Sequence, residues 1–446
     1  MSSAEHLLAA LRADAAPDDW FARLQGVDYD DLFVTALALG LAPLLHHRLE
    51  SWGRTLPDPK AQAKLAFARR AEESRHAALR VQLGEVLARL PSPPIVLKGA
   101  YLAEKVYPAP GLRPMNDIDL LFRPADLPAA AEALRALGYE SKEKSADLGP
   151  GITKHLSTFK RPVETPHPAE TTHWAEMTHR AETTHRVVST PNPYVSGVGE
   201  RMIEPHGSLE ESWFGLKCDL TPGMWERSVE IEIAGQRARA LSPEDNLLHL
   251  CVHLTFHLIM GSPSFVQLAD LAVYLARVAV ARPDFLARAD ALNASGYCYA
   301  ALRLAQRTLA VVLLPDILPA LAAASAPNVR AAAETLSLSD VLRRTQRPPL
   351  RTLPQRIKRG FEDRLETARW AHSFGEWRRI WGTLFDFTRT DTWQMVKSQG
   401  PNAKPQDPNP KAQIPNPEPQ DRVTIAESAQ RLSTREKVRP IHCHPA

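Results

Sequence analysis

Two aspartates interrupt an apolar stretch, "NDIDLLF" at residues 116–122, and this stretch constrains the fold more than any other feature. Alternation along a β-strand sends Asp117 and Asp119 to one face and Ile118 and Leu120 to the other. Two carboxylates held side by side raise each other's pKa, because each charge disfavours ionisation of its neighbour. The pattern therefore predicts a strand with one buried face and one face that offers paired acids to a cation.

The residues around this strand predict a compact α/β unit. "PIVLKG" is apolar and β-branched, which predicts a strand that ends at Gly99. "AYLAEKVY" at residues 100–107 predicts a helix, and residues 124–139 predict another with Gly138 just past its end. "ITKHLSTFKR" at residues 152–161 follows as a further strand. Strands and helices thus alternate on both sides of the two acids.

The groups near the acids suit phosphate chemistry. Gly99 lets the backbone turn with free N–H groups at a helix start, and Lys98 and Arg113 add cations. Acids that hold Mg²⁺ beside such groups are the parts that phosphoryl or nucleotidyl transfer needs. Purely structural roles for these residues stay open. Asp117 and Asp119 could be capping or salt-bridged acids, and Lys98 could be a surface lysine. Arg113 could pair with a carboxylate or a helix end.

Composition and hydropathy narrow the class of protein. The 446 residues carry a formal net charge of only +3, so no dedicated nucleic-acid surface is evident. The four cysteines are scattered, which indicates neither a zinc ribbon nor a disulfide framework. The first residues lack the pattern of a secretory signal, and no apolar run approaches the roughly 20 residues of a membrane span. We expect a soluble, cytoplasmic protein without a membrane partner.

The chain is predicted to have four parts. Ser2 and Glu5 form a capping-box pattern that starts a helical N-terminal segment, and Ser242 with Asp245 starts a second helical region. Residues beyond about Gln399 are proline-rich and too poor in apolar residues to offset the entropy of ordering. The predicted parts are a helical segment (1–90), a catalytic domain (91–240), a helical C-terminal domain (241–390) and a disordered tail (391–446).

A hexapeptide repeat interrupts the catalytic domain at residues 169–186, "AETTHWAEMTHRAETTHR". Steps of six rotate by about 240° on a helix, which scatters His173, His179 and His185 over three faces. On a strand the three histidines share a face but lie roughly 20 Å apart. Neither arrangement closes one coordination sphere, so we predict a disordered insertion over residues 163–200 and no metal site there.

His249, His253 and His257 recur every fourth residue on the predicted helix after Ser242. This spacing is also found in metal-binding helices, but leucines follow each histidine and indicate a buried helix. We therefore favour packed histidines that hydrogen-bond the catalytic domain. Asp270 is expected to pair with a basic side chain, with a substrate contact as the alternative.

Taken together, several segments of the chain resemble the uncharacterised nucleotidyltransferase family of the DNA polymerase β-like nucleotidyltransferase superfamily. The resemblance spans roughly residues 5–320 without the hexapeptide insertion and implies an α+β fold, a mixed sheet with flanking helices. Its most specific part is "VLKGAYLAEKVYPAPGLRPMNDIDLLF". It continues through "MIEPHGSL", "LSPEDNLLHLCVHLTFH" and "QLADLAVYL".

The resemblance implies a metal-dependent nucleotidyltransferase. In this family pattern Asp117, Asp119 and Glu204 would hold two Mg²⁺ ions, with Mn²⁺ as a possible substitute. An NMP group would pass from an NTP to a hydroxyl of an unidentified small molecule, sugar or protein, with release of pyrophosphate. Glu204 would assist proton removal, Lys98 and Gly99 would hold phosphates, and Arg113 would neutralise developing charge.

Some residues depart from the family pattern. Lys98 and Gly99 replace the usual Gly-Ser pair of the superfamily, and Gly207 stands where tryptophan is typical. Pro205 lacks an N–H, which favours an edge or distorted strand. His206 shares a strand face with Glu204 and is either a substrate contact or a packed histidine. Two alternative functions stay open: a non-catalytic member that binds nucleotide or a partner, and a D-x-D glycosyltransferase.

Overall fold

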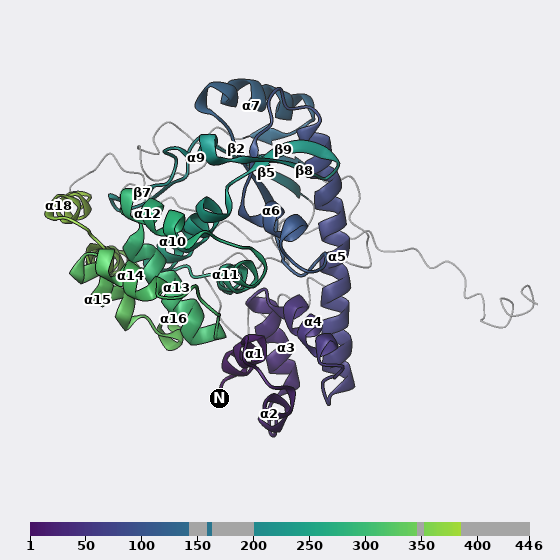
Figure 1. Ribbon diagram of the computed structural model, residues 1–446. Helices are drawn as coiled ribbons and strands as arrows, with labels where there is room; N and C mark the ends of the chain where they lie inside the picture. Colours follow the sequence, from purple (N-terminus) through teal and green to yellow (C-terminus); the bar gives the residue numbers. More distant parts are fainter. Residues whose placement is uncertain (142–157, 163–199, 346–351, 385–446) are drawn as a thin grey trace, which may run out of the picture. The chain divides into compact units, whose positions relative to one another are not determined.

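The computed structural model describes residues 1–141, 158–162, 200–345 and 352–384 (Figure 1). Contacts divide the chain into two units, Met1–Ser398 and Gln399–Ala446, and every described residue belongs to the first. The hexapeptide repeats with their three histidines, the rest of the insertion up to residue 199 and the predicted tail lie outside the described residues.

The described residues form a seven-stranded mixed sheet with the strand order β3-β4-β5-β2-β1-β9-β8. The pairs β2/β5 and β1/β9 are parallel and the other neighbours are antiparallel. Helices flank the sheet, so the predicted α+β class is confirmed. The strands are β1 (Ile95–Val96), β2 (Asp117–Leu121), β3 (Glu140–Ser141), β4 (Phe159–Pro162), β5 (Glu200–His206), β8 (Val229–Ile233) and β9 (Gln236–Ala240).

Strand β2 has the two faces that its alternation predicts. Ile118, Leu120 and Phe122 are buried in one apolar cluster with residues of α5 (Pro59–Leu87) and α7 (Leu127–Ala136). Figure 1 shows β2 and β5 as neighbouring strands next to α7. The other face of β2 carries the two aspartates, which leaves them on the side away from α7.

Strand β1 is shorter than its sequence predicts. It ends at Val96 instead of Gly99, and helix α6 (Lys98–Lys105) begins two residues earlier than expected. Leu97 between them is extended, and its N–H still bonds the carbonyl of Asp119 at 3.1 Å. Gly99 therefore lies within the first turn of α6 rather than at the end of a strand.

Five of the described helices precede the sheet in the chain, and the long α5 packs against β9. The predicted capping box is present, because Glu5 N–H donates to Ser2 Oγ at 3.3 Å and Ser2 N–H donates to Glu5 Oε2 at 2.7 Å. In the described part of the chain no single helix has the length and apolar composition of a membrane span, although α3 and α4 together, bent by 119°, meet both criteria. These helices are α1 (Ser3–Leu11), α2 (Pro17–Ala22), α3 (Tyr29–Ala38), α4 (Ala42–Ser51) and the long α5.

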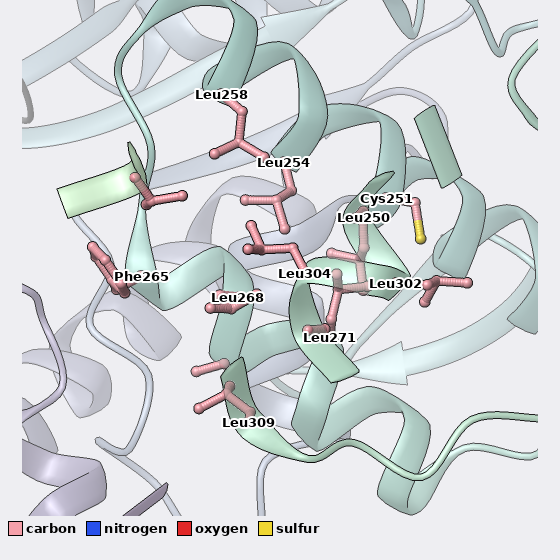
Figure 2. Close-up of a cluster of buried hydrophobic side chains, with 14 of the residues drawn as sticks. Leu250, Cys251, Leu254, Leu258, Phe265, Leu268, Leu271, Leu302, Leu304 and Leu309 are labelled. Atoms are coloured by element: carbon pink, nitrogen blue, oxygen red, sulfur yellow. The ribbon is translucent and has the colours of Figure 1, made fainter. Parts of the chain in front are cut away.

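Helices after the sheet form a leucine-rich bundle. Helix α10 begins at Pro243 with the predicted cap, since Asp245 N–H donates to Ser242 Oγ at 3.2 Å. Figure 2 shows buried side chains of α10, α11 and α13 gathered in one cluster. The helices are α10 (Pro243–Met260), α11 (Phe265–Arg277), α12 (Arg282–Ala291), α13 (Ser295–Leu309), α14 (Ile317–Ala324), α15 (Pro327–Thr335), α16 (Leu338–Thr345), α17 (Leu353–Ala368) and α18 (Phe374–Gly382).

One apolar core connects these regions. Leu45 of α4, Leu121 of β2 and Leu254 of α10 are all fully or almost fully buried within it. Residues on both sides of the boundaries predicted at 90 and 240 therefore contribute to the same core.

A hairpin outside the main sheet packs against α10. Strands β6 (Glu210–Trp213) and β7 (Leu216–Asp219) pair through a two-residue turn, in which Phe214 and Gly215 have φ values of 45° and 84°. Positive φ at both positions is typical of a type I′ turn, whose twist matches the paired strands. The hairpin buries Glu211.

Candidate active site

Acidic side chains converge where β2 and β5 lie side by side. Their parallel register pairs Asp119 with Glu204, so both carboxylates lie on one face of the sheet. One ligand atom each from Asp119, Glu204 and His206 lies within 4.8 Å of the others. Asp119 and His206 are buried, whereas Glu204 is partly exposed. Asp117 begins the same strand two residues before Asp119 and points to the same side.

His206 holds Asp119 in place. Its Nε2 lies 2.8 Å from Asp119 Oδ1, a short contact in which the imidazole N–H donates to the carboxylate. The sequence allowed two interpretations of His206, a substrate contact or a packed histidine. The structure makes it a buried partner of a predicted metal ligand, and its shared strand face with Glu204 was the signal that indicated its side.

The electrostatics of this cluster follow from burial and like charge. Burial and the charge of Asp119 together raise the pKa of Asp117 to about 6, against the opposing effects of Lys98 and Arg113. Burial likewise raises the pKa of Glu204 to about 7, with added repulsion from Asp119 and Asp117. The carboxylates therefore disfavour one another's ionised forms, and a bound cation would relieve that repulsion.

Lys98 brings a positive charge to the acids from the first position of α6. Its Nζ lies 3.6 Å from Asp119 Oδ1 and 3.3 Å from His253 Nε2. The N-cap residue Leu97 makes no side-chain cap bond to the first turn. Unsatisfied N–H groups of a first helical turn attract anions, so the start of α6 suits a phosphate group.

Gly99 lets α6 approach Arg113 closely. A Cβ added at Gly99 would lie 3.2 Å from Arg113 Nη1 and 3.8 Å from Met115 Sδ. Any larger residue would force the guanidinium of this arginine to shift by a few tenths of an ångström.

Arg113 itself is held by a buried ion pair. Its Nε and Nη2 donate to the two carboxylate oxygens of Asp270 on α11, both at 2.8 Å, and Tyr107 Oη donates to the same carboxylate at 2.8 Å. The expectation that Asp270 pairs with a basic side chain is confirmed. The charge of Arg113 still lowers the pKa of Asp117, while its predicted contact with phosphate stays a prediction.

Pro205 was expected in an edge or distorted strand, and it lies in an inner strand at a position with a described partner on one side. Strand β5 lies between β4 and β2, but its described pairing with β4 stops at Ile203. Pro205 pairs only with Leu120 of β2 in the described register. Its missing N–H thus falls beyond the β4 ladder, which is how an inner strand tolerates a proline.

The histidines of α10 take different partners. His253 Nδ1 lies 2.8 Å from Glu211 Oε1, which confirms that this helix hydrogen-bonds the predicted catalytic domain. His257 Nδ1 instead lies 3.0 Å from the carbonyl of Ser262 in its own helix end. Ligand atoms of Glu211, His249 and His253 also lie within 4.8 Å of one another. Glu211 was missed, because no pattern near it in the sequence indicates a site.

The comparison with known protein families decides the classification. The model of the uncharacterised nucleotidyltransferase family matches residues 25–310. The chain belongs to this family. That range contains the whole described sheet, the acids of β2 and β5, and helices α10 and α11, close to the predicted resemblance over residues 5–320. No curated protein and no solved structure gives a significant match.

The acids of this nucleotidyltransferase suit a hard divalent cation. Carboxylate oxygens are the ligands that Mg²⁺ prefers, and Asp117, Asp119 and Glu204 would supply them. Burial and mutual repulsion raise the pKa values of Asp117 and Glu204, and a bound cation would offset both effects. The residues present therefore fit the group that nucleotidyl transfer requires.

Proposed function

We propose that this nucleotidyltransferase moves an NMP group from an NTP to a hydroxyl of an acceptor and releases pyrophosphate. The observation that carries the proposal is the pairing of Asp119 with Glu204 across parallel strands, with Asp117 next on the same face. Lys98 at the start of α6 lies 3.6 Å from Asp119, which puts a helix N-terminus and an ammonium next to the acids. Acids for a cation and donors for phosphates thus share one site.

In the proposed reaction the acceptor oxygen attacks the α-phosphorus of the NTP. The bond from the α-phosphorus to the oxygen that bridges to the β-phosphorus breaks, and pyrophosphate leaves with that electron pair. The hydroxyl proton passes to the carboxylate of Glu204.

The other residues hold the nucleotide. Lys98 and the first turn of α6 bind the phosphates, Gly99 keeps that turn open to Arg113, and Asp117 and Asp119 hold the cation. A divalent cation, when bound, lowers the pKa of the acceptor hydroxyl and balances the charge of the phosphates. The acceptor is a small molecule, a sugar or a protein hydroxyl.

Transfer from radiolabelled nucleotide tests the proposal. Each α-labelled NTP is incubated with the full-length protein, Mg²⁺ and a soluble cell extract as the source of acceptor, and pyrophosphate release and labelled product are measured. We expect Mg²⁺-dependent product with at least one NTP and none with Asp119→Asn.

Three other outcomes would overturn the proposal. Mg²⁺-dependent NTP binding without product in any extract would indicate a non-catalytic binding protein. Transfer of sugar from a labelled UDP-sugar, supplied in place of the NTP, would indicate a glycosyltransferase. Failure to bind any of the four NTPs with Mg²⁺ would exclude both nucleotidyl transfer and nucleotide binding.

A further inference from the structure

We infer that the buried pair Glu211 and His253 positions Lys98 for the nucleotide. This inference rests on the proposed function and adds two residues to it from outside the acidic cluster. Glu211 lies on the β6–β7 hairpin and His253 on α10, so both come from elements beyond the strands that carry the acids. Both residues act on the site through the lysine.

A continuous series of contacts connects the two buried residues to the acids. Glu211 Oε1 lies 2.8 Å from His253 Nδ1, and His253 Nε2 lies 3.3 Å from Lys98 Nζ. Lys98 Nζ in turn lies 3.6 Å from Asp119 Oδ1. The exposed fractions of the Glu211 and His253 side chains are 6% and 8%, so water screens their interaction little.

The contacts decide where the imidazole proton lies. The Glu211 carboxylate accepts, so His253 Nδ1 carries the hydrogen. His253 Nε2 is then bare and accepts from the Lys98 ammonium, which has no lone pair of its own. The Glu211 carboxylate thus sets the tautomer of His253, and this tautomer presents the acceptor Nε2 to the lysine.

This arrangement keeps the lysine from neutralising the acids by itself. A distance of 3.6 Å to Asp119 is an ion-pair distance rather than a direct hydrogen bond. An ammonium has three N–H donors, and His253 takes one of them. Another donor can then meet a phosphate oxygen, while the carboxylate of Asp119 stays available to the cation.

A metal ion held by Glu211, His249 and His253 is the competing use of these residues. The three ligand atoms are close enough for it. The ammonium of Lys98, 3.3 Å from His253 Nε2, would face the charge of such an ion across the ring. An ion at Nδ1 would replace the existing bond to Glu211. Positioning of the lysine is compatible with both contacts, and so we favour it.

Two substitutions of His253 test the roles of its two ring nitrogens separately. In His253→Asn the amide nitrogen takes the place of Nδ1 and keeps the bond to Glu211, but no acceptor faces Lys98. In His253→Gln the amide oxygen takes the place of Nε2 and keeps that acceptor. Both amides are neutral and polar, so a general disturbance of the buried site would affect the two variants alike.

Binding of Mg²⁺ with the tightest-binding NTP is measured by calorimetry on the full chain. We expect Kd to rise about 10-fold for His253→Asn, the loss of one hydrogen bond to a charged group, and to stay within about three-fold for His253→Gln. In a Lys98→Met background, His253→Asn should cause no further change in Kd, because its effect passes through the lysine. In ¹⁵N spectra of the wild type, His253 should carry its hydrogen on Nδ1.

The outcomes that overturn the inference differ from those that overturn the proposed function. No nucleotide binding by the wild type would remove the proposed function and the inference with it. Equal Kd values for the wild type and His253→Asn would remove the inference alone. The inference would also fail if His253→Asn weakened binding equally in the Lys98→Met background, or if His253 carried its hydrogen on Nε2. It would fail as well if the purified protein held one equivalent of a transition metal that the substitution His249→Ala releases.

Discussion

Asp119 on β2 lies directly opposite Glu204 on β5, and His206, two residues further along β5, donates to the same aspartate. The parallel register alone brings the two carboxylates together, because residues paired across parallel strands share a face.

Removal of one paired acid should abolish transfer without unfolding the protein. For Asp119→Asn we expect the rate of pyrophosphate release to fall by at least about 100-fold, since a bound cation contributes several kcal/mol. Thermal unfolding should stay close to that of the wild type, because the substitution also removes a repulsive charge. Glu230→Gln, an exposed acid of β8 in the same sheet, is the control and should keep full activity.

The contribution of Asp117 and Glu204 to the stability of the cation-free protein should fall as pH rises. Asp117 and Glu204 have pKa values raised to about 6 and 7, so between about pH 4 and 7 the folded chain keeps protons that the unfolded chain has released. Their contribution is therefore complete below pH 4 and lost above pH 7. We expect a loss on the order of 1–3 kcal/mol between pH 5 and 8, measured by urea unfolding.

The matched control for this pH effect is the double variant Asp117→Asn/Glu204→Gln, which should lose less stability over the same range. Millimolar Mg²⁺ should restore stability to the wild type at pH 8 but not to this variant. An identical pH slope in the two proteins would contradict the electrostatic account of the acids.

Loss of either member of the buried pair Arg113 and Asp270 should destabilise the fold. Their side chains are 9% and 1% exposed, and breaking a buried pair from one side costs about 3–5 kcal/mol. We expect Arg113→Met and Asp270→Leu each to show this loss, and the double variant to lose less than the two losses combined, because no charge then stays unpaired. For comparison, Asp18→Asn removes an exposed partner of Arg54 and should cost less than about 1 kcal/mol.

Gly111 should tolerate no side chain. Its φ is +70°, and an added Cβ would lie 2.5 Å from the backbone nitrogen of Glu73 on α5. Gly111→Ala combines a left-handed backbone with a backbone clash, so we expect a loss of roughly 2–5 kcal/mol in urea unfolding. Gly26→Ala has a similar φ of +75° with no atom within 4 Å, and should lose only about 1–2 kcal/mol. Similar losses in both variants would exclude the clash as a cause.

How far the sequence predicts this site depends on the range of the forces involved. The two-residue period of β2 predicts which side Asp117 and Asp119 face, and the capping patterns at Ser2 and Ser242 predict where two helices start. These are local effects. The end of β1 was misplaced, because helix α6 already begins at Lys98 and takes Gly99 into its first turn.

The second group of residues needed the tertiary structure. The four-residue spacing of the α10 histidines indicates one helical stripe, but nothing in that spacing names Glu211 as the partner of His253. Their contact exists only because the β6–β7 hairpin packs on α10. A charged residue in a short hairpin resembles any solvated acid until its neighbour is known, and this is why sequence reasoning passed over it.

The shared core sets a limit on how this protein can be divided. A fragment that stops at residue 240 would lack Asp270 and His253, and with them the partners of Arg113 and Lys98. It would also leave the Leu121 side of the sheet open to water. These helices share the core of the part that carries the acids, so a truncation that keeps the site has to begin beyond them.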